Sequence, residues 1–120
     1  MSSRVVHFEI PANNPEKTGK FYTDLFDWKM QNSGMAEMEY WFFATGDGPG
    51  IDGAIMKRMD PKQPWMNYVQ VDSIDAAIEK AKKLGGNVAL PKTPIPGMGA
   101  YAAVTDPEGN IVGLWEVVKQ

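Results

Sequence analysis

Apolar and polar residues alternate near the start of the chain, a pattern typical of a half-buried β-strand. His7 and Glu9 lie two residues apart and share one face of this strand, which covers residues 5–10. The apolar residues of the other face are Val6, Phe8 and Ile10. We therefore expect this strand to bury one face and to present an imidazole and a carboxylate together on the other.

A helix is predicted directly after this strand. Asn14 can cap its free amide groups, Pro15 suits the first helical position, and Glu16 meets the positive end of the helix dipole. Helical spacing gives it an apolar stripe made of Thr18, Phe21, Tyr22 and Leu25. We expect the last three of these side chains to fill the core between helix and sheet.

A second helix is predicted to begin at residues 72–75, where Ser73 stands among acidic residues. The spacing of an amphipathic helix is matched by Ile74, Ala77, Ile78, Ala81 and Leu84. Gly85 and Gly86 end this helix. It should therefore pack one apolar face against the second half of the sheet.

The remaining segments read as strands and turns. Strand-forming residues or turn-bounded apolar runs occur at residues 38–44, 51–56, 65–71, 87–90, 99–105 and 111–118. Residues 31–34 and 106–110 are predicted to be turns. The Pro- and Gly-rich segment 91–98 is predicted to be an excursion, and its part 94–98, followed by Tyr101, is either a lid over a ligand site or a rigid connector.

The pattern of elements repeats once along the chain. A shift of about 59 residues lays the first strand over the fifth and one helix over the other. With 120 residues, we expect a single domain over 1–120, with module one at about 1–60 and module two at about 61–120. Two such modules, each covering one sheet face with a helix, would enclose a cavity; the alternative is an α+β sandwich whose halves are alike by chance.

Several segments in order resemble the vicinal oxygen chelate superfamily, which includes glyoxalase I, bleomycin-resistance proteins, fosfomycin-resistance enzymes and extradiol dioxygenases. The segments that carry the resemblance are 7–10, 20–28, 71–75, 83–86 and 106–116. The resemblance covers essentially the whole chain. It implies an α+β fold of two βαβββ modules, a cupped eight-stranded mixed sheet, and commonly a homodimer.

Metal-using members of that superfamily carry one metal ligand on the first strand and one on the last strand of each module. His7 matches the first of these positions, and the equivalent position in module two is Met66. The last-strand positions fall on Ala54, or on Met56 if the register slips by two, and on Gly113. Because three of four positions lack an imidazole or carboxylate, we expect no bound metal and no cofactor.

Further ligands for a metal ion could come only from nearby carboxylates. Glu9 shares its predicted face with His7, whereas alternation along the last strand points Glu116 away from Gly113. His7 is the chain's single histidine, and there is no cysteine. A site built from several imidazoles or thiolates is therefore excluded.

The predicted cup is lined by aromatic, thioether and polar side chains. Glu9 and His7 are the candidate catalytic residues, with the carboxylate as general base; alternatively they only satisfy each other within the cavity. We expect a small organic ligand to be bound by Met56, Met66, Tyr68, Tyr101 and Trp115.

Charge and composition narrow the function further. The net charge of −3 argues against a nucleic-acid partner, and no stretch is apolar for long enough to cross a membrane. We expect a cytoplasmic protein, in keeping with an N-terminus that lacks an apolar leader. The resemblance then implies a metal-independent binding or resistance-type protein. The alternative is a lyase, isomerase or dioxygenase of the same superfamily, metal-dependent or using Glu9 as its base.

Overall fold

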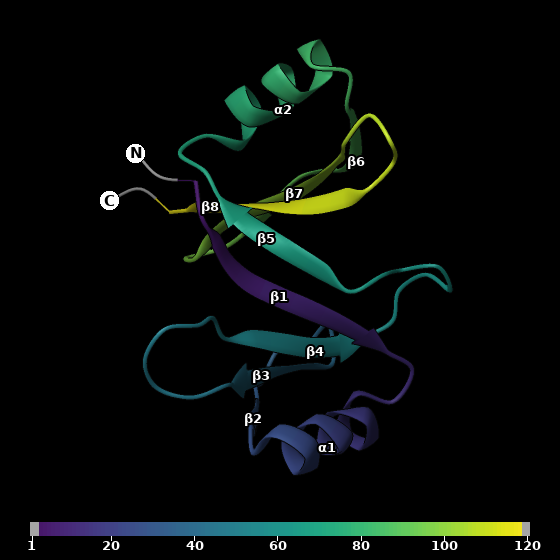
Figure 1. Ribbon diagram of the computed structural model, residues 1–120, viewed down its shortest axis with the longest axis vertical. Helices are drawn as coiled ribbons and strands as arrows, with labels where there is room; N and C mark the ends of the chain where they lie inside the picture. Colours follow the sequence, from purple (N-terminus) through teal and green to yellow (C-terminus); the bar gives the residue numbers. More distant parts are fainter. Residues whose placement is uncertain (1–2, 119–120) are drawn as a thin grey trace. The chain divides into compact units, whose positions relative to one another are not determined.

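The computed structural model describes residues 3–118 as two compact units (Figure 1). The N-terminal unit is His7–Met66, and the C-terminal unit is formed by the described residues on either side of it. Each unit is described by itself below. Both have a mixed β-sheet and one helix, as the α+β prediction requires.

The N-terminal unit follows the order β-α-β-β-β. Its elements are β1 (Val5–Ala12), α1 (Pro15–Phe26), β2 (Lys29–Asn32), β3 (Tyr40–Ala44) and β4 (Gly53–Lys57). The strands lie side by side in the order β2-β3-β4-β1, with β1 parallel to β4 and the other pairs antiparallel.

The C-terminal unit repeats this order. Its elements are β5 (Met66–Gln70), α2 (Ile74–Lys83), β6 (Asn87–Ile95), β7 (Gly99–Thr105) and β8 (Ile111–Val117). The strands run in the order β5-β8-β7-β6, with β5 parallel to β8. The predicted fold class, an eight-stranded mixed α+β fold built from two βαβββ arrangements, is confirmed.

The repeat extends to the register of the parallel strand pairs. Glu9 lies opposite Ala54 in the first pair, and Tyr68 lies opposite Gly113 in the second. Tyr68 follows Glu9 in the sequence by the same number of residues as Gly113 follows Ala54. The sequence shift therefore found true structural equivalents, including Ala54 rather than Met56 as the partner of Glu9.

Helix α1 begins as predicted but buries a different stripe. The Asn14 side chain accepts a hydrogen bond from the Lys17 amide, and Pro15 occupies the first turn. Phe21 and Leu25, expected in the core, are 59% and 56% exposed, so that prediction was wrong. The face against the sheet is instead centred on Pro15, Gly19 and Tyr22. Gly19 lies against the Met30 side chain, a close approach that places Phe21 and Leu25 on the flank of the helix.

Helix α2 follows its prediction except at its end. Ser73 accepts a hydrogen bond from the Ala76 amide, and Ile74 is fully buried. Ala77, Ile78 and Ala81 pack against the core. Leu84 is 68% exposed, contrary to the prediction, because the helix already ends at Lys83 and Leu84 has left the helical path of the stripe.

Two predicted loops are strands. Residues 31–34 were expected to form a turn, but β2 continues to Asn32 before Gly34 turns with a positive φ of 79°. Strand β6 likewise extends through Pro91 and Pro94 to Ile95, paired with β7. Both strands lie at a sheet edge, where few side chains are buried, so their hydrophobic signal is weak.

The longer β6 also replaces the predicted excursion by a hairpin, and whether its tip covers a ligand site stays a prediction. Pro94 and Ile95 lie opposite Ala100 and Gly99, so only a tight turn remains between β6 and β7. The prolines are tolerated because the edge strand does not need every amide for pairing, and the register shifts around Leu90 and Thr93. The 94–98 segment is the tip of a hairpin.

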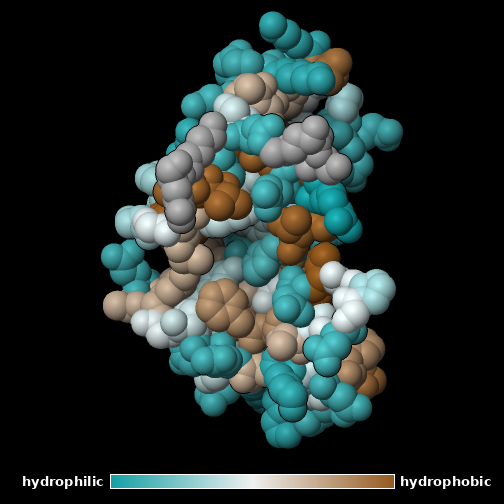
Figure 2. Space-filling view, turned by 90° about the vertical axis from the view of Figure 1, so that its left-hand side faces the viewer, coloured by the Kyte–Doolittle hydropathy of each residue, from teal (hydrophilic) through white to brown (hydrophobic). Residues whose placement is uncertain are grey.

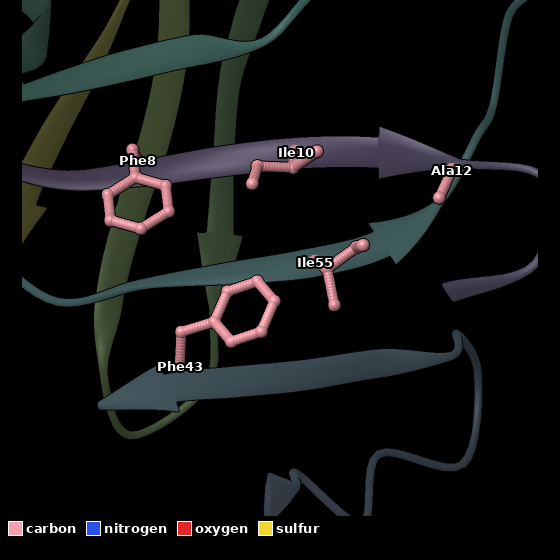
Figure 3. Close-up of a cluster of buried hydrophobic side chains, with 5 residues drawn as sticks. All are labelled: Phe8, Ile10, Ala12, Phe43 and Ile55. Carbon is pink, nitrogen blue, oxygen red and sulfur yellow. The ribbon is translucent and has the colours of Figure 1, made fainter. Parts of the chain in front are cut away.

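The core of the N-terminal unit lies between its sheet and α1. The side chains drawn in Figure 3 come from three adjacent strands and point toward one another: Phe8, Ile10, Ala12, Phe43 and Ile55. Tyr22 and Trp28 pack against this cluster. The Phe8 ring lies 5.6 Å from Trp28 and 6.5 Å from Phe43, centre to centre. The alternation seen in residues 5–10 therefore assigned the buried face of β1 correctly.

Replacing Gly53 by alanine is expected to lower the free energy of unfolding by about 1–2 kcal/mol. A Cβ at Gly53 would come within 2.6 Å of the Phe8 ring, which lies directly opposite it. Overpacking of this kind costs about 1–3 kcal/mol, partly offset by the lower freedom of alanine in the unfolded chain. Urea unfolding measures the loss. With Phe8→Leu in the background, Gly53→Ala should cost less; an unchanged cost would show that the ring is not the cause.

Candidate functional site

The sheet face of the N-terminal unit opposite α1 carries the predicted polar pair. His7 and Glu9 project from β1 on this face, because Phe8 and Ile10 point into the core with α1. Tyr40, Ala54 and Met56 form a separate buried cluster on β3 and β4. Ala54 lies opposite Glu9, and Met56 lies opposite Tyr40.

Tyr40 links the two predicted residues through its hydroxyl group. Its Oη donates a hydrogen bond of 2.7 Å to Glu9 Oε2. His7 Nε2 lies 2.9 Å from the same Oη. Since the single hydroxyl proton goes to the carboxylate, His7 must donate through an Nε2–H group to the oxygen lone pair. The three side chains form one directed chain, from imidazole to phenol to carboxylate.

The geometry of the sheet explains how Tyr40 reaches Glu9. Strand β4 lies between β3 and β1, and its residue at the level of Glu9 is Ala54. The methyl side chain of Ala54 is fully buried in contact with Tyr40. A residue as small as alanine lets the Tyr40 side chain cross β4 and approach the carboxylate.

Tyr40 is a site residue that sequence reasoning did not find. It is the first of four consecutive aromatic residues, 40–43, whose inward and outward faces the sequence leaves unassigned. The structure places Tyr40 and Phe42 on the Glu9 face and directs Phe43 into the core. The signal that could have settled this is pairing with β4, where Ala54 and Met56 stand opposite Phe42 and Tyr40.

Burial controls the charge of His7. Desolvation lowers the pKa of His7 below its ordinary value of 6.5, and the negative charges of Glu9 and Asp52 oppose this only in part. Neutral imidazole is therefore the favoured form near pH 7. A neutral His7 with its proton on Nε2 agrees with the hydrogen bond to Tyr40.

We expect the stability of the protein to fall as the pH drops below about 6.5, partly through His7. The unfolded chain takes up a proton on His7 more readily than the folded protein does. The stabilising contribution is therefore complete above about 6.5 and is lost as the pH falls through the lower folded-state pKa. Urea midpoints measured across this range should decline more steeply for the wild type than for His7→Asn. Parallel curves would contradict the lowered pKa.

The donor set does not fit the divalent ion of the metal-using relatives. Of the four ligand positions that the resemblance implies, only His7 carries an imidazole or carboxylate, and Met66, Ala54 and Gly113 carry none. Glu116 accepts a 2.7 Å hydrogen bond from the Ile74 amide at the start of α2, so it points to the helix side as expected. Within residues 3–118, no three His, Asp or Glu side chains are grouped as metal ligands would be.

The predicted ligand-binding residues fall into two sets, one in each unit. Met56 and Met66 are buried and fall within His7–Met66, the N-terminal unit, whose last residue is also the first residue of β5. In the C-terminal unit Tyr101 lies opposite Trp115, and Tyr68 lies opposite Gly113. These aromatic residues share the face away from α2, because the alternate residues Ala102 and Leu114 pack against that helix. Their role in ligand binding stays a prediction.

Phe42 adds an exposed ring to the Glu9 face. Its side chain is 40% exposed, and its ring centre lies 5.5 Å from that of Tyr40 in an edge-to-face arrangement.

In Figure 2 the hydrophobic surface of the visible side occurs in patches among hydrophilic residues. In the part of the chain that the structure describes, neither helix is long and apolar enough to cross a membrane.

The comparison with protein families decides the identity of the fold. The model of the Glyoxalase/Bleomycin resistance protein/Dioxygenase superfamily matches residues 4–114. The chain belongs to this superfamily. The match spans both βαβββ arrangements, so the resemblance noted from short sequence segments is confirmed.

Curated members of the superfamily include proteins of similar sequence. The protein named "Putative glyoxylase CFP32" from Mycobacterium tuberculosis is 34% identical over 115 residues, which are 90% of this chain and 43% of that protein. The chain thus spans less than half the length of this relative. A glyoxylase-like domain-containing protein from Didymella fabae is 31% identical over 116 residues, or 92% of this chain and 91% of its own.

Solved structures of the superfamily share the fold at low sequence identity. Methylmalonyl-CoA epimerase from Mycobacterium tuberculosis is 14% identical, with a TM-score of 0.72 over 99% of this chain and 93% of its own. A glyoxalase/bleomycin resistance protein/dioxygenase superfamily member from Vibrio splendidus is 13% identical, with a TM-score of 0.66 over 96% and 99%. These similarities establish the fold alone.

Proposed function

We propose that this superfamily member binds a small organic molecule at the Glu9 face of its N-terminal unit without using a metal ion. The observation that carries the proposal is the Tyr40 bridge, which holds a carboxylate and an imidazole at fixed positions. A few oriented polar groups beside apolar side chains are typical of small-molecule sites. Ala54, Met56 and Phe42 supply the apolar surroundings.

The known proteins support binding of a small molecule without defining it. A solved methylmalonyl-CoA epimerase of the same fold is described in complex with methylmalonyl-CoA. We carry over only the general point that this fold accommodates an organic ligand. A binding or resistance-type role in the cytoplasm, in a homodimer of single-domain chains, is part of our proposal. Gel filtration with light scattering tests the homodimer.

The proposal is tested by ligand screening with matched variants. A library of small aromatic and polar compounds is screened by thermal shift against the wild type, Glu9→Gln and Tyr40→Phe. Compounds that stabilise the wild type should stabilise both variants less, because binding raises stability through mass action. Glu108→Gln, which changes an exposed carboxylate in a turn, is the control. Equal stabilisation of the wild type and Glu9→Gln by every hit would refute the proposed site.

The metal-free part is tested separately by titration with Mn²⁺, Zn²⁺ and Ni²⁺. Three of the family's four ligand positions lack a donor, so we expect no stoichiometric rise in melting temperature that a chelator reverses. The His7→Asn variant is the matched control, because it removes the one imidazole. A chelator-reversible rise in the wild type that is lost in His7→Asn would overturn this part of the proposal.

A second candidate function is catalysis with Glu9 as general base. It is favoured by the short Tyr40–Glu9 hydrogen bond, which orients the carboxylate, and by burial of the neighbouring imidazole. A bound hit with an acidic C–H group would then exchange that hydrogen with D₂O in the presence of protein. Proton NMR measures the exchange, and an equal rate with Glu9→Gln would remove this candidate.

A further inference from the structure

Resting on the homodimer that is part of the proposed function, we infer that two copies of this chain associate through the outer flank of α1, with the two α1 helices packed antiparallel. The outer flank is the exposed side of α1 that carries Phe21 and Leu25. Three features of the N-terminal unit support this inference. They are the apolar surface exposed on the flank, its contrast with α2, and the order of the charges along α1.

The outer flank of α1 belongs to a continuous apolar patch. Phe21 and Leu25 are 59% and 56% exposed. The Phe21 ring lies 5.2 Å from that of Tyr22, centre to centre. Tyr22 in turn lies 6.1 Å from Trp65, which is 49% exposed. Single exposed apolar residues are normal on a protein surface, but a contiguous patch of this kind marks an interaction site.

The equivalent helix of the C-terminal unit shows that the fold does not require this patch. The sequence shift of the repeat lays Asn14 over Ser73, and both residues cap the start of their helix. The same shift lays Phe21 over Lys80, whose side chain is exposed. At the same position of the same arrangement, α2 thus carries a charged residue where α1 carries an exposed ring. Packing of α1 on its own sheet does not explain Phe21, whereas contact with another molecule does.

The charges along α1 identify that molecule as a second copy of the same helix. Lys17 lies four residues before Phe21 and Asp24 three residues after it, so helical spacing places both beside the ring. Lys20 pairs with Asp24 within the helix at 2.9 Å, and both side chains are largely exposed. The flank is therefore basic before Phe21 and acidic after it.

This order of charges is complementary to itself in one orientation only. In an antiparallel pair, Lys17 and Lys20 of each copy lie beside Asp24 of the other, and the four-charge cluster keeps the Lys20–Asp24 pair of each helix. A parallel pair would instead place like charges together. The antiparallel arrangement also brings the positive end of each helix dipole to the negative end of the other.

The size of the surface predicts a weak dimer. Helix α1 has 12 residues and is therefore about 18 Å long. A pair of helices of this length buries less than the roughly 1,200 Å² of a typical stable complex. We expect a dissociation constant of about 10–100 µM. The exposed charges contribute mainly to orientation, because surface ion pairs add little affinity.

Sedimentation velocity of the full chain, from about 5 µM to 1 mM, tests the inference. The average mass of the wild type should rise with concentration toward that of two chains. Phe21→Lys copies the residue of α2 and should weaken association about tenfold or more, because it would bury an ammonium group. Leu84→Lys changes an exposed leucine of α2 and should leave association unchanged. Amide NMR spectra show whether the variants fold, and Leu25→Lys replaces Phe21→Lys if that variant does not.

A mixing experiment tests the identity of the partner and its orientation. A chain with Lys17→Glu and Lys20→Glu has an acidic flank throughout, and a chain with Asp24→Lys has a basic one. Each variant repels its own copy but is complementary to the other. At low salt the mixture should associate about fivefold or more tightly than either variant alone. Equal association of the mixture and the single variants would refute the antiparallel α1 pair.

The outcomes separate this inference from the proposed function. A dimer that forms equally well with Phe21→Lys would overturn the inference and leave the homodimer standing. A wild type that stays monomeric at about 1 mM would overturn both the inference and the homodimer. Binding of a small molecule at the Glu9 face is tested independently, by the thermal-shift screen.

Discussion

Phe43→Ala is expected to lower the free energy of unfolding by about 3–5 kcal/mol, the largest effect of any substitution considered for this protein. The Phe43 ring is 1% exposed and packs between the sheet and α1. Ring centres of Trp28 and Tyr22 lie 5.2 and 6.0 Å away. Truncation removes the buried ring and leaves a cavity that a sheet and a helix close only partially.

The neighbouring residue supplies the control for this prediction. Phe42 has the same side chain on the same strand but points to the opposite face and is 40% exposed. Phe42→Ala should cost about 1 kcal/mol or less. Both are measured by urea unfolding with a common m-value. Equal losses for the two variants would contradict the assignment of the two faces of β3.

The parts of the fold that could be predicted are those with a strong local pattern. Alternation in β1 assigned Phe8 and Ile10 to the core and Glu9 to the other face. The caps at Asn14 and Ser73 marked both helix starts, because capping depends on a few adjacent residues. Where a structural feature depends on a few adjacent residues, as alternation and helix caps do, the sequence was sufficient to predict it.

The wrong predictions arose where tertiary contacts decide. The stripe of α1 was assigned to Phe21 and Leu25 by size, yet the helix approaches the sheet most closely at Gly19, next to Met30. A small residue that permits close packing carries no hydrophobic signal of its own. Strand β2 was missed for a related reason, since it lies at an edge with most of its side chains exposed.

The sequence predicted two of the three hydrogen-bonded residues of the candidate site and missed the residue that joins them. His7 and Glu9 follow from the parity of one strand, but Tyr40 joins them from β3, which is distant in sequence. The Tyr40 bridge crosses Ala54, one of the positions at which the resemblance led us to expect a metal ligand. The small side chain of Ala54 makes room for the hydrogen-bonded chain, and this relation is visible only in the strand register.

Tyr40→Phe is expected to lower the free energy of unfolding by about 2–3 kcal/mol. The substitution keeps the buried ring but deletes the hydroxyl that donates to Glu9 and accepts from His7. A hydrogen bond to a charged group contributes about 1.5–3 kcal/mol and a neutral one about 0.5–1.5 kcal/mol. Water recovers part of this loss, because Glu9 and His7 are only half-buried. Urea unfolding measures the difference.

Tyr101→Phe is the matched control for this prediction. Tyr101 lies opposite Trp115 on β8 as Tyr40 lies opposite Met56 on β4, and within the described residues its hydroxyl makes no hydrogen bond. Its loss should therefore change stability by about 0.5 kcal/mol or less. A double-mutant cycle of Tyr40→Phe with Glu9→Gln should give a coupling of about 1–2 kcal/mol. Additive losses would show that the phenol and the carboxylate act independently, and the site would lose the contact that fixes its geometry.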